Sequence, residues 1–377
     1  MCDFLSGVVT MERHPKVLCG DLRHHSTTVH RCKLKPETYR EWEWTKDDDG
    51  QSLTVRAIPG ENPNILKSAI LAKFANRRAC LNDCIRQVND FKSELYLNEL
   101  TSAEGLTLPQ HVDGGLWLPN LPSAEGLTLP QTVGGCLHLG ALISAEGLTL
   151  PQTVGSHLYL SGLTSVKTLT LPQTVGGDLY LGKLSSAVGL TLPRTVGGDL
   201  WLGSLTSTKG LTLPQTVGGN LWLASLTSAK GLTLPQTVGG TIHLGRLTSA
   251  AGLTLPQTVG GDLHLGGLTS AEGLVLPQTV GGTLFLDGLA SAVGLTLPQT
   301  VGVHLYLNSL TSAKGLTFPQ TIGHNLYLNS LASTEGLTWP QTVGGDLWIN
   351  GLPSLEGLTL PQKVGGDVFT KFGKVVK

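Results

Sequence analysis

Apolar and polar positions recur along this chain with a period of 21 residues, from Leu100 to Gly351, without an insertion or a deletion. Twelve complete copies fill that span, and a thirteenth begins at Leu352. The consensus of one copy is LTSAEGLTLPQTVGGDLYLGS. A strict period in this range is typical of solenoids, in which each copy forms one coil that stacks on the previous coil.

Two segments of each copy alternate between apolar and polar residues, which is the pattern of a half-buried strand. In the copy that begins at Leu205 they are 211–213 and 220–223. Pro214 ends the first strand, and we expect Gly218 and Gly219 to form a turn with positive φ. The predicted core consists of six stacked columns, represented by Leu205, Leu211, Leu213, Val217, Leu221 and Leu223. The pattern predicts a mainly β protein, a parallel β-solenoid of 21-residue coils with two short strands per coil.

The central residue of the second strand is expected to point away from the core, because side chains alternate across a strand. Every copy has an aromatic residue or a histidine there, although aromatic residues make up only 5% of the chain. The column consists of Trp117, His138, Tyr159, Tyr180, Trp201, Trp222, His243, His264, Phe285, Tyr306, Tyr327 and Trp348. We therefore expect a ladder of stacked rings on the outer face.

The residue two positions before each ring is mostly polar, as in Asp178, Asp199, Asn220 and Asp262. Stiff rings flanked by such groups suit the recognition of a protein or a carbohydrate, because they lose little entropy on binding. The leading hypothesis is a non-enzymatic binding or scaffold protein that contacts its partner at many weak sites. In the alternative hypotheses, the ladder stabilises its own sheet, or it joins copies in a homo-oligomer or structural rod. The histidine rungs also predict binding that changes near about pH 6–7.

The first predicted strand carries a column of threonine from Thr107 to Thr359, with Val275 in place of one threonine. Regular threonine ladders on flat solenoids suggest ice binding, and antifreeze solenoids present a T-x-T pair on each strand. Here one threonine per strand is expected to face outward, close to a proline. The high strand propensity and solubility of threonine also explain such a column, so ice binding is a secondary hypothesis.

Residues 1–91 lack the repeat and form a separate predicted domain, followed by the solenoid over 92–377. Strands are expected at Cys2–Thr10 and Val17–Leu22, followed by a hairpin with Asp47-Asp48-Asp49-Gly50 at its tip. Asn62-Pro63 begins a predicted helix, and a second helix follows at about 78–89. The first 91 residues therefore predict a small α+β domain that caps the open first coil.

Two groups in this N-terminal domain suggest chemistry. Removal of Met1 leaves Cys2 as a terminal thiol, the arrangement of N-terminal nucleophile enzymes, although the residues after it do not match their usual start. A second group could hold zinc but fits no standard spacing, and it consists of Cys19, His24, His25, His30 and Cys32. An enzyme built on either group is the alternative to a binding protein. The leading prediction is no catalytic site, no metal and no cofactor.

The composition of the chain limits its expected binding partners and its expected cellular location. Charged residues make up 14% of the chain and the net charge is −1, so attraction to nucleic acid or to an anionic membrane is not indicated. No apolar run approaches the roughly 20 residues that span a bilayer. Asp3 lies where a signal peptide has basic residues, and six cysteines do not form a disulfide scaffold. A cytoplasmic location is the default prediction, with non-classical export or a place in a virion as alternatives.

Two resemblances follow from particular residues. Leu221-x-Leu223-x-x-Leu226 resembles the core of leucine-rich repeats, and Val217-Gly-Gly-Asn-Leu-Trp-Leu resembles bacterial and phage arrays with V-G-G-x-L-x-L units. The resemblance implies a solenoid, but in the twelve complete copies the asparagine that follows the strand in standard repeats appears only at Asn308, Asn329 and Asn350. For this reason we expect a flattened two-sheet solenoid. The opening Met-Cys-Asp-Phe-Leu-Ser resembles uncharacterised phage and environmental proteins, a resemblance that implies no activity.

Overall fold

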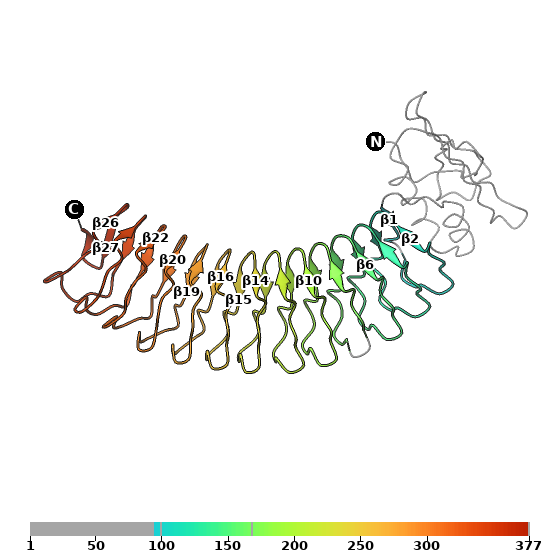
Figure 1. The fold of residues 1–377 in the computed structure, drawn as a ribbon, viewed down its shortest axis with the longest axis horizontal. Coiled ribbons are helices and arrows are strands. Elements are labelled where there is room, and N and C mark those ends of the chain that lie inside the picture. Colours follow the sequence, from blue (N-terminus) through green and yellow to red (C-terminus); the bar gives the residue numbers. More distant parts are fainter. Residues whose placement is uncertain (1–93, 99, 167–168, 376–377) are drawn as a thin grey trace, which may run out of the picture. The chain divides into compact units, whose positions relative to one another are not determined.

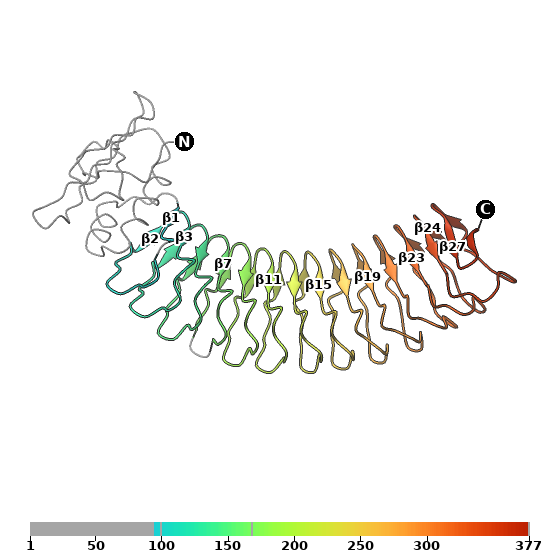
Figure 2. The same cartoon turned by 180° about the vertical axis from the view of Figure 1, so that it is seen from behind.

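The computed structural model describes residues 94–98, 100–166 and 169–375. These residues form a parallel β-solenoid of about thirteen coils, which confirms the predicted fold class (Figures 1 and 2). They contain no helix. The coils fall into two compact units, with the division at Val175 and Gly176, except that residues 164–166 group with the second unit. The predicted N-terminal strands, hairpin and helices, with the capping role assigned to them, lie outside the described residues.

Each coil contributes one even-numbered and one odd-numbered strand. In unit 1 the strands are β1 (Leu95–Tyr96), β2 (His111–Val112), β3 (Leu116–Trp117), β4 (Thr132–Val133), β5 (Leu137–His138), β6 (Thr153–Val154), β7 (Leu158–Tyr159) and β8 (Thr174–Val175). The odd strands of unit 2 are β9 (Leu179–Tyr180), β11 (Leu200–Trp201), β13 (Leu221–Trp222), β15 (Ile242–His243), β17 (Leu263–His264), β19 (Leu284–Phe285), β21 (Leu305–Tyr306), β23 (Leu326–Tyr327), β25 (Leu347–Trp348) and β27 (Val368–Thr370). Its even strands are β10 (Thr195–Val196), β12 (Thr216–Val217), β14 (Thr237–Val238), β16 (Thr258–Val259), β18 (Thr279–Val280), β20 (Thr300–Val301), β22 (Thr321–Ile322), β24 (Thr342–Val343) and β26 (Lys363–Val364), and the last described strand is β28 (Gly373–Val375).

Equivalent strands of successive coils pair in parallel with a register of one repeat. In the odd sheet of unit 2, Trp201 on β11 lies opposite Trp222 on β13. In the even sheet, Thr195 on β10 lies opposite Thr216 on β12. The backbone hydrogen bonds follow the same rule, since the amide of Leu221 donates to the carbonyl of Thr241 at 2.8 Å. Each rung of the sheet therefore repeats the same residue type one coil later.

The second predicted strand is confirmed, but the first lies five residues further along the coil than expected. The structure forms β12 at Thr216–Val217, whereas the predicted segment 211–213 is not a strand. That segment reaches its neighbours only through isolated bridges in other coils, such as Thr233 to Thr254. Proline follows it in each of these coils and lacks the amide hydrogen that a ladder needs, so pairing resumes only after the proline.

Most of the predicted core columns are buried, and one further column contributes. Leu205, Leu221 and Leu223 are fully buried, and Leu211 is buried as well. Leu213 is half-buried, whereas its equivalents in several other coils, such as Leu192 and Leu234, are buried. Ala229 and its equivalents in most of the other described coils are also buried, although alanine carries little apolar signal in a sequence. A side chain of this size lets the loop lie close to the core.

Glycine serves two different purposes in one coil. The Gly-Gly pair does not adopt positive φ, contrary to the prediction; instead, a Cβ on Gly218 would lie 2.1 Å from the carbonyl oxygen of Gly197 in the previous coil. Positive φ occurs at the other glycine of the repeat, such as Gly231 with φ of 76°. The pair is therefore required for close backbone approach, and the single glycine for backbone conformation.

The thirteenth coil is complete and carries a closing strand. Its strand β26 pairs with β24, and β27 pairs with β25. The last strand β28 turns back and pairs antiparallel with β27. Lys374 Nζ lies 2.6 Å from Asp367 Oδ1 beside this hairpin. The C-terminal edge of the odd sheet is thus paired with a strand from its own chain, which limits further strand addition there.

Candidate functional site: the ring column

The predicted outward rings all lie on odd strands, and every one of them is half-buried. We call this set the ring column. The structure adds Tyr96 on β1 and Phe369 on β27, which the sequence analysis omitted. Both follow a buried Leu or Val in the same alternating pattern, so the pattern itself could have identified them. The column is continuous within each unit.

In unit 2 the rings stack on one another with nearly parallel planes. The centroids of Trp201 and Trp222 are 4.2 Å apart at 9°, and those of Trp222 and His243 are 3.5 Å apart at 12°. The stack continues from His243 to His264 at 4.3 Å, from His264 to Phe285 at 4.2 Å, from Phe285 to Tyr306 at 4.9 Å, from Tyr306 to Tyr327 at 4.3 Å, from Tyr327 to Trp348 at 6.0 Å and from Trp348 to Phe369 at 4.0 Å. Register fixes this arrangement, because a one-repeat offset places each ring over the next.

Unit 1 has a looser stack. The centroids of Tyr96 and Trp117 are 5.5 Å apart, those of Trp117 and His138 are 5.3 Å apart, and those of His138 and Tyr159 are 4.7 Å apart. In both units the neighbouring rungs cover the ring faces, so a ligand meets ring edges along most of the column. The edge of an aromatic ring carries the positive part of its quadrupole, which favours contact with aromatic faces and with oxygen acceptors.

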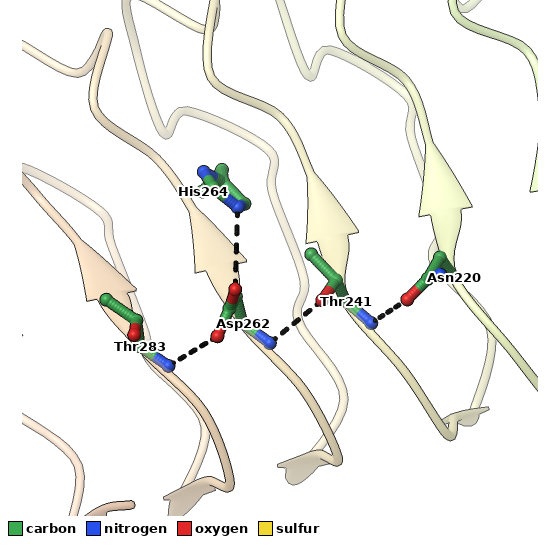
Figure 3. Close-up of polar contacts among 5 residues, drawn as sticks. All are labelled: Asn220, Thr241, Asp262, His264 and Thr283. Atoms are coloured by element: carbon green, nitrogen blue, oxygen red, sulfur yellow. Dashed lines mark hydrogen bonds and ion pairs between the residues drawn. The ribbon is translucent and has the colours of Figure 1, made fainter. Parts of the chain in front are cut away.

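The polar column two residues before the rings links successive coils through hydrogen bonds (Figure 3). The amide of Thr241 donates to Asn220 Oδ1 at 2.7 Å, and the amide of Asp262 donates to Thr241 Oγ1 at 3.1 Å. The amide of Thr283 then donates to Asp262 Oδ1 at 2.6 Å. Each side chain therefore accepts a hydrogen bond from the backbone amide of its counterpart in the next coil. These amides lie just before the odd strands and are not used in the strand pairing.

The same contact recurs at the other predicted contact residues. Asp178 Oδ1 accepts the amide of Asp199, and Asp199 Oδ1 accepts the amide of Asn220, both at 2.7 Å. Asp199 Oδ2 also accepts from Asn220 Nδ2 at 3.1 Å. Asp262 Oδ2 lies 4.0 Å from His264 Nε2. Each of these side chains therefore links its coil to the next one through a hydrogen bond. The contribution of Asp178, Asp199, Asn220 and Asp262 to ligand recognition stays a prediction.

A short asparagine ladder does occur near the C-terminal end of unit 2. Asn308 Nδ2 donates to Asp287 Oδ1 at 2.8 Å, Asn329 Nδ2 donates to Asn308 Oδ1 at 2.7 Å, and Asn350 Nδ2 donates to Asn329 Oδ1 at 2.8 Å. These residues follow the odd strand, where leucine-rich repeats have their asparagine. Earlier coils of unit 2 have Gly or Ala at this position and cannot form the ladder.

Three tryptophans of the ring column bury an indole N–H without a partner. The Nε1 atoms of Trp201, Trp222 and Trp348 make no hydrogen bond among the described residues. In contrast, Trp117 Nε1 donates to Glu94 Oε2 on the previous coil. Glutamate is one methylene longer than the Asp or Asn that precedes the other tryptophans, and this added length reaches the indole. Each unpaired N–H costs about 1–3 kcal/mol, which the stacking of the ring offsets in part.

The histidine rungs have depressed pKa values. Desolvation lowers the pKa of His138 and of His264, and it lowers the pKa of His243 to about 4, with the neighbouring His264 adding to the effect. His243 therefore stays neutral near pH 6–7, and the pKa values of the other two rungs shift in the same direction. A change of binding near pH 6–7 stays a prediction.

This shift predicts a pH dependence of stability. The unfolded chain binds a proton at His243 more readily than the folded chain does, so the His243 contribution is complete above about pH 6.5 and is lost as the pH falls toward about 4. Because the ring is half-exposed, we expect a loss of about 1–2 kcal/mol. Urea unfolding at pH 7 and pH 4.5, compared between the wild type and His243→Phe, measures it. Equal pH sensitivity in the two proteins would contradict the assignment.

The other predicted chemical sites lie outside the described residues, namely Cys2 and the cluster of Cys19, His24, His25, His30 and Cys32. In the part of the chain that the structure describes, no group of three His, Cys, Asp or Glu side chains could hold a metal ion. No helix among those same residues is long and apolar enough to cross a membrane. Among the described residues, the ring column is therefore the candidate functional site.

No known protein was found to be similar to this chain. No protein-family model matches the chain, and neither a curated protein nor a solved structure matches it.

Proposed function

We propose that the chain is a non-enzymatic scaffold that binds a protein partner along the ring column of unit 2. The observation that carries this proposal is the continuous stack from Tyr180 to Phe369, in which every rung is half-exposed. A contiguous aromatic stripe of this kind is rare on surfaces that make no contact. Unit 1 repeats the surface over fewer rungs.

Stacking makes the surface rigid before any partner arrives. Each ring from Trp201 to Phe369 is held between parallel neighbours or at the end of the stack, so little side-chain entropy remains to be lost on binding. A repeated surface also presents the same contact once per coil. Many weak contacts of one type then add up when the partner is extended or is itself repetitive.

Ring edges favour a protein over a carbohydrate. Sugars usually bind aromatic residues by lying flat on an open ring face, and within the stack those faces touch the next rung, as at Trp222 and His243. Edges suit aromatic, carbonyl and apolar groups of a polypeptide. A carbohydrate partner is therefore the alternative, and it would need polar contacts from the Asp and Asn column.

Removal of the rings tests the proposal. We expect the variant Trp201→Ala/Trp222→Ala/His243→Ala/His264→Ala to lose at least about tenfold in affinity for peptides selected from a random library against the wild type. The matched control replaces four exposed residues of the two central coils of this set, as Lys209→Ala/Gln215→Ala/Lys230→Ala/Gln236→Ala, and should bind like the wild type. Circular dichroism establishes that both variants are folded.

The other outcomes of this experiment assign the surface differently. If no selected peptide distinguishes the ring variant from the control, the protein-binding proposal fails. A glycan array bound by the wild type and not by the ring variant would assign the surface to carbohydrate. Light scattering on the same samples would assign it to self-association if the wild type is oligomeric and the ring variant is monomeric.

A further inference from the structure

Two columns of threonine lie on a different surface from the ring column, and we call them together the threonine face. In unit 2 the first column runs before the proline of each coil, and the second occupies the even strands β10 to β24. The first column contains Thr191, Thr212, Thr233, Thr254, Thr296, Thr317, Thr338 and Thr359, with Val275 among them. The second contains Thr195, Thr216, Thr237, Thr258, Thr279, Thr300, Thr321 and Thr342.

Both columns face outward. Every residue of the first column is exposed, and those of the second are exposed or half-buried. In unit 1, one surface hollow is lined by Thr149 and Thr170 of the first column and by Thr153 and Thr174 of the second. The two columns therefore border a common surface. The second column was not predicted, because the even strand lies five residues further along the coil than expected.

The spacing along each column is regular. Thr195 pairs with Thr216, and Thr279 pairs with Thr300, each with a register of one repeat. Neighbouring parallel strands are about 4.8 Å apart, so the second column, which lies on the even strands, presents one hydroxyl and one methyl group at about that interval. The first column pairs in the same parallel sense but only at isolated bridges, from Thr233 to Thr254 and from Thr317 to Thr338.

Within unit 2, one hydroxyl group of the threonine face makes a hydrogen bond to another described residue: Thr359 Oγ1 accepts from Trp339 Nε1 at 3.0 Å. From Thr191 to Thr342, no side-chain hydroxyl of either column makes a hydrogen bond to another described residue. The stretch of each coil from the first column to the second is also almost free of charge. In unit 2 only Arg194, in the first coil of the face, and Lys363, in the last, carry a charge there. Neither internal hydrogen bonding nor charge therefore explains why threonine fills these positions.

Another exposed column of the same coils shows that the array tolerates variety. The position before the positive-φ glycine holds Val188, Lys209, Lys230, Ala251, Glu272, Val293, Lys314, Glu335 and Glu356. If solubility and strand propensity were the only demands on the threonine face, its residues would vary in a similar way. In unit 2 the single deviation from threonine before Lys363 is Val275, which keeps the branched shape of threonine.

From these observations we propose that the threonine face binds ice. A rigid, uncharged surface with hydroxyl and methyl groups in regular rows can hold water in rows of matching order, and the repeated water lattice of an ice surface is a ligand with that regularity. The hydroxyl groups donate and accept hydrogen bonds. The methyl groups lose unfavourable contact with liquid water when the surface adsorbs. This activity does not depend on the ring column.

Thermal hysteresis of the purified full chain tests this inference. We expect the wild type to hold ice crystals without growth below the melting point, with a gap that widens with protein concentration, and to partition into growing ice. We expect Thr212→Tyr/Thr233→Tyr/Thr254→Tyr to lose most of the hysteresis, because a large ring on one column lifts the face from a flat lattice. Tyrosine favours strands, so this variant should fold.

The same coils offer a matched control. Thr206, Thr227 and Thr248 are also exposed threonines, one per coil, but they lie outside the two columns. The variant Thr206→Tyr/Thr227→Tyr/Thr248→Tyr should keep the hysteresis of the wild type, and so should the ring variant. The inference is overturned if the wild type shows neither hysteresis nor partition into ice, or if the control variant loses as much as the face variant.

Discussion

Replacing Gly239 with alanine is expected to lower the free energy of unfolding by about 3 kcal/mol, although it adds only one methyl group at an exposed corner. The Cβ would lie 2.1 Å from the carbonyl oxygen of Gly218, an atom of the previous coil's backbone that cannot rotate away. The two coils must separate at this corner, which lengthens the hydrogen bond from the amide of Gly239 to the carbonyl of Val217. Urea unfolding followed by circular dichroism measures the loss.

Two other glycines nearby separate the possible causes. Gly231→Ala meets no atom within 4 Å but must hold alanine at positive φ, so we expect a loss of about 1–2 kcal/mol. Gly245→Ala meets no atom within 4 Å and has no positive φ, so we expect almost no change. If Gly239→Ala is no worse than Gly245→Ala, close approach is not the reason for the Gly-Gly pair.

Replacing Asn325 with leucine is expected to lower the free energy of unfolding by about 2 kcal/mol, because it removes the hydrogen bonds that this buried side chain makes to its polar neighbours. Asn325 is a buried member of the polar column, and its Oδ1 accepts the amide of Asp346 and Nδ1 of His324, both at 2.8 Å. Its Nδ2 donates to the hydroxyl of Tyr327 at 2.8 Å. Hydrogen exchange at the Asp346 amide measures the loss of this hydrogen bond, and urea unfolding measures the change in the free energy of unfolding.

Aspartate at the same position supplies the control. Asn325→Asp keeps the oxygen that accepts the amide of Asp346, and Tyr327 can donate to the second oxygen, as Tyr180 donates to Asp178 Oδ2 at 2.9 Å. We therefore expect Asn325→Asp to stay within about 0.5 kcal/mol of the wild type. An equal loss in both variants would show that side-chain volume, and not the amide contact, determines the stability at this position.

The sequence was sufficient to predict the coil and the column of rings. Alternation around Leu221 and Leu223 identified a strand with an outward Trp222, and the period placed each ring over the next one. It was not sufficient to place the other strand, because Leu211-Thr212-Leu213 alternates as well as any strand. Only the pairing in space shows that Pro214 interrupts the segment and that Thr216–Val217 forms the sheet.

The polar column shows a second limit of sequence reasoning. In the sequence, Asp199 and Asn220 resemble surface residues that are available to bind a ligand. In the structure, each accepts a hydrogen bond from a backbone amide one repeat ahead. Spacing within a single copy carries no sign of a hydrogen bond that joins two copies. The same holds for Gly218, because the oxygen that excludes a side chain belongs to the preceding coil.

Pairing with a constant register also has a consequence for how such a chain folds and evolves. Strand partners and most hydrogen bonds between coils link residues about one repeat apart, as in Leu221 with Thr241, so no strand pairing waits for the closure of a long loop. Folding can begin at any pair of coils and spread outward in steps of equal size. Unequal crossing-over in the gene would then add or remove whole coils without creating a new kind of contact, and length becomes a quantity that selection can adjust in units of one coil.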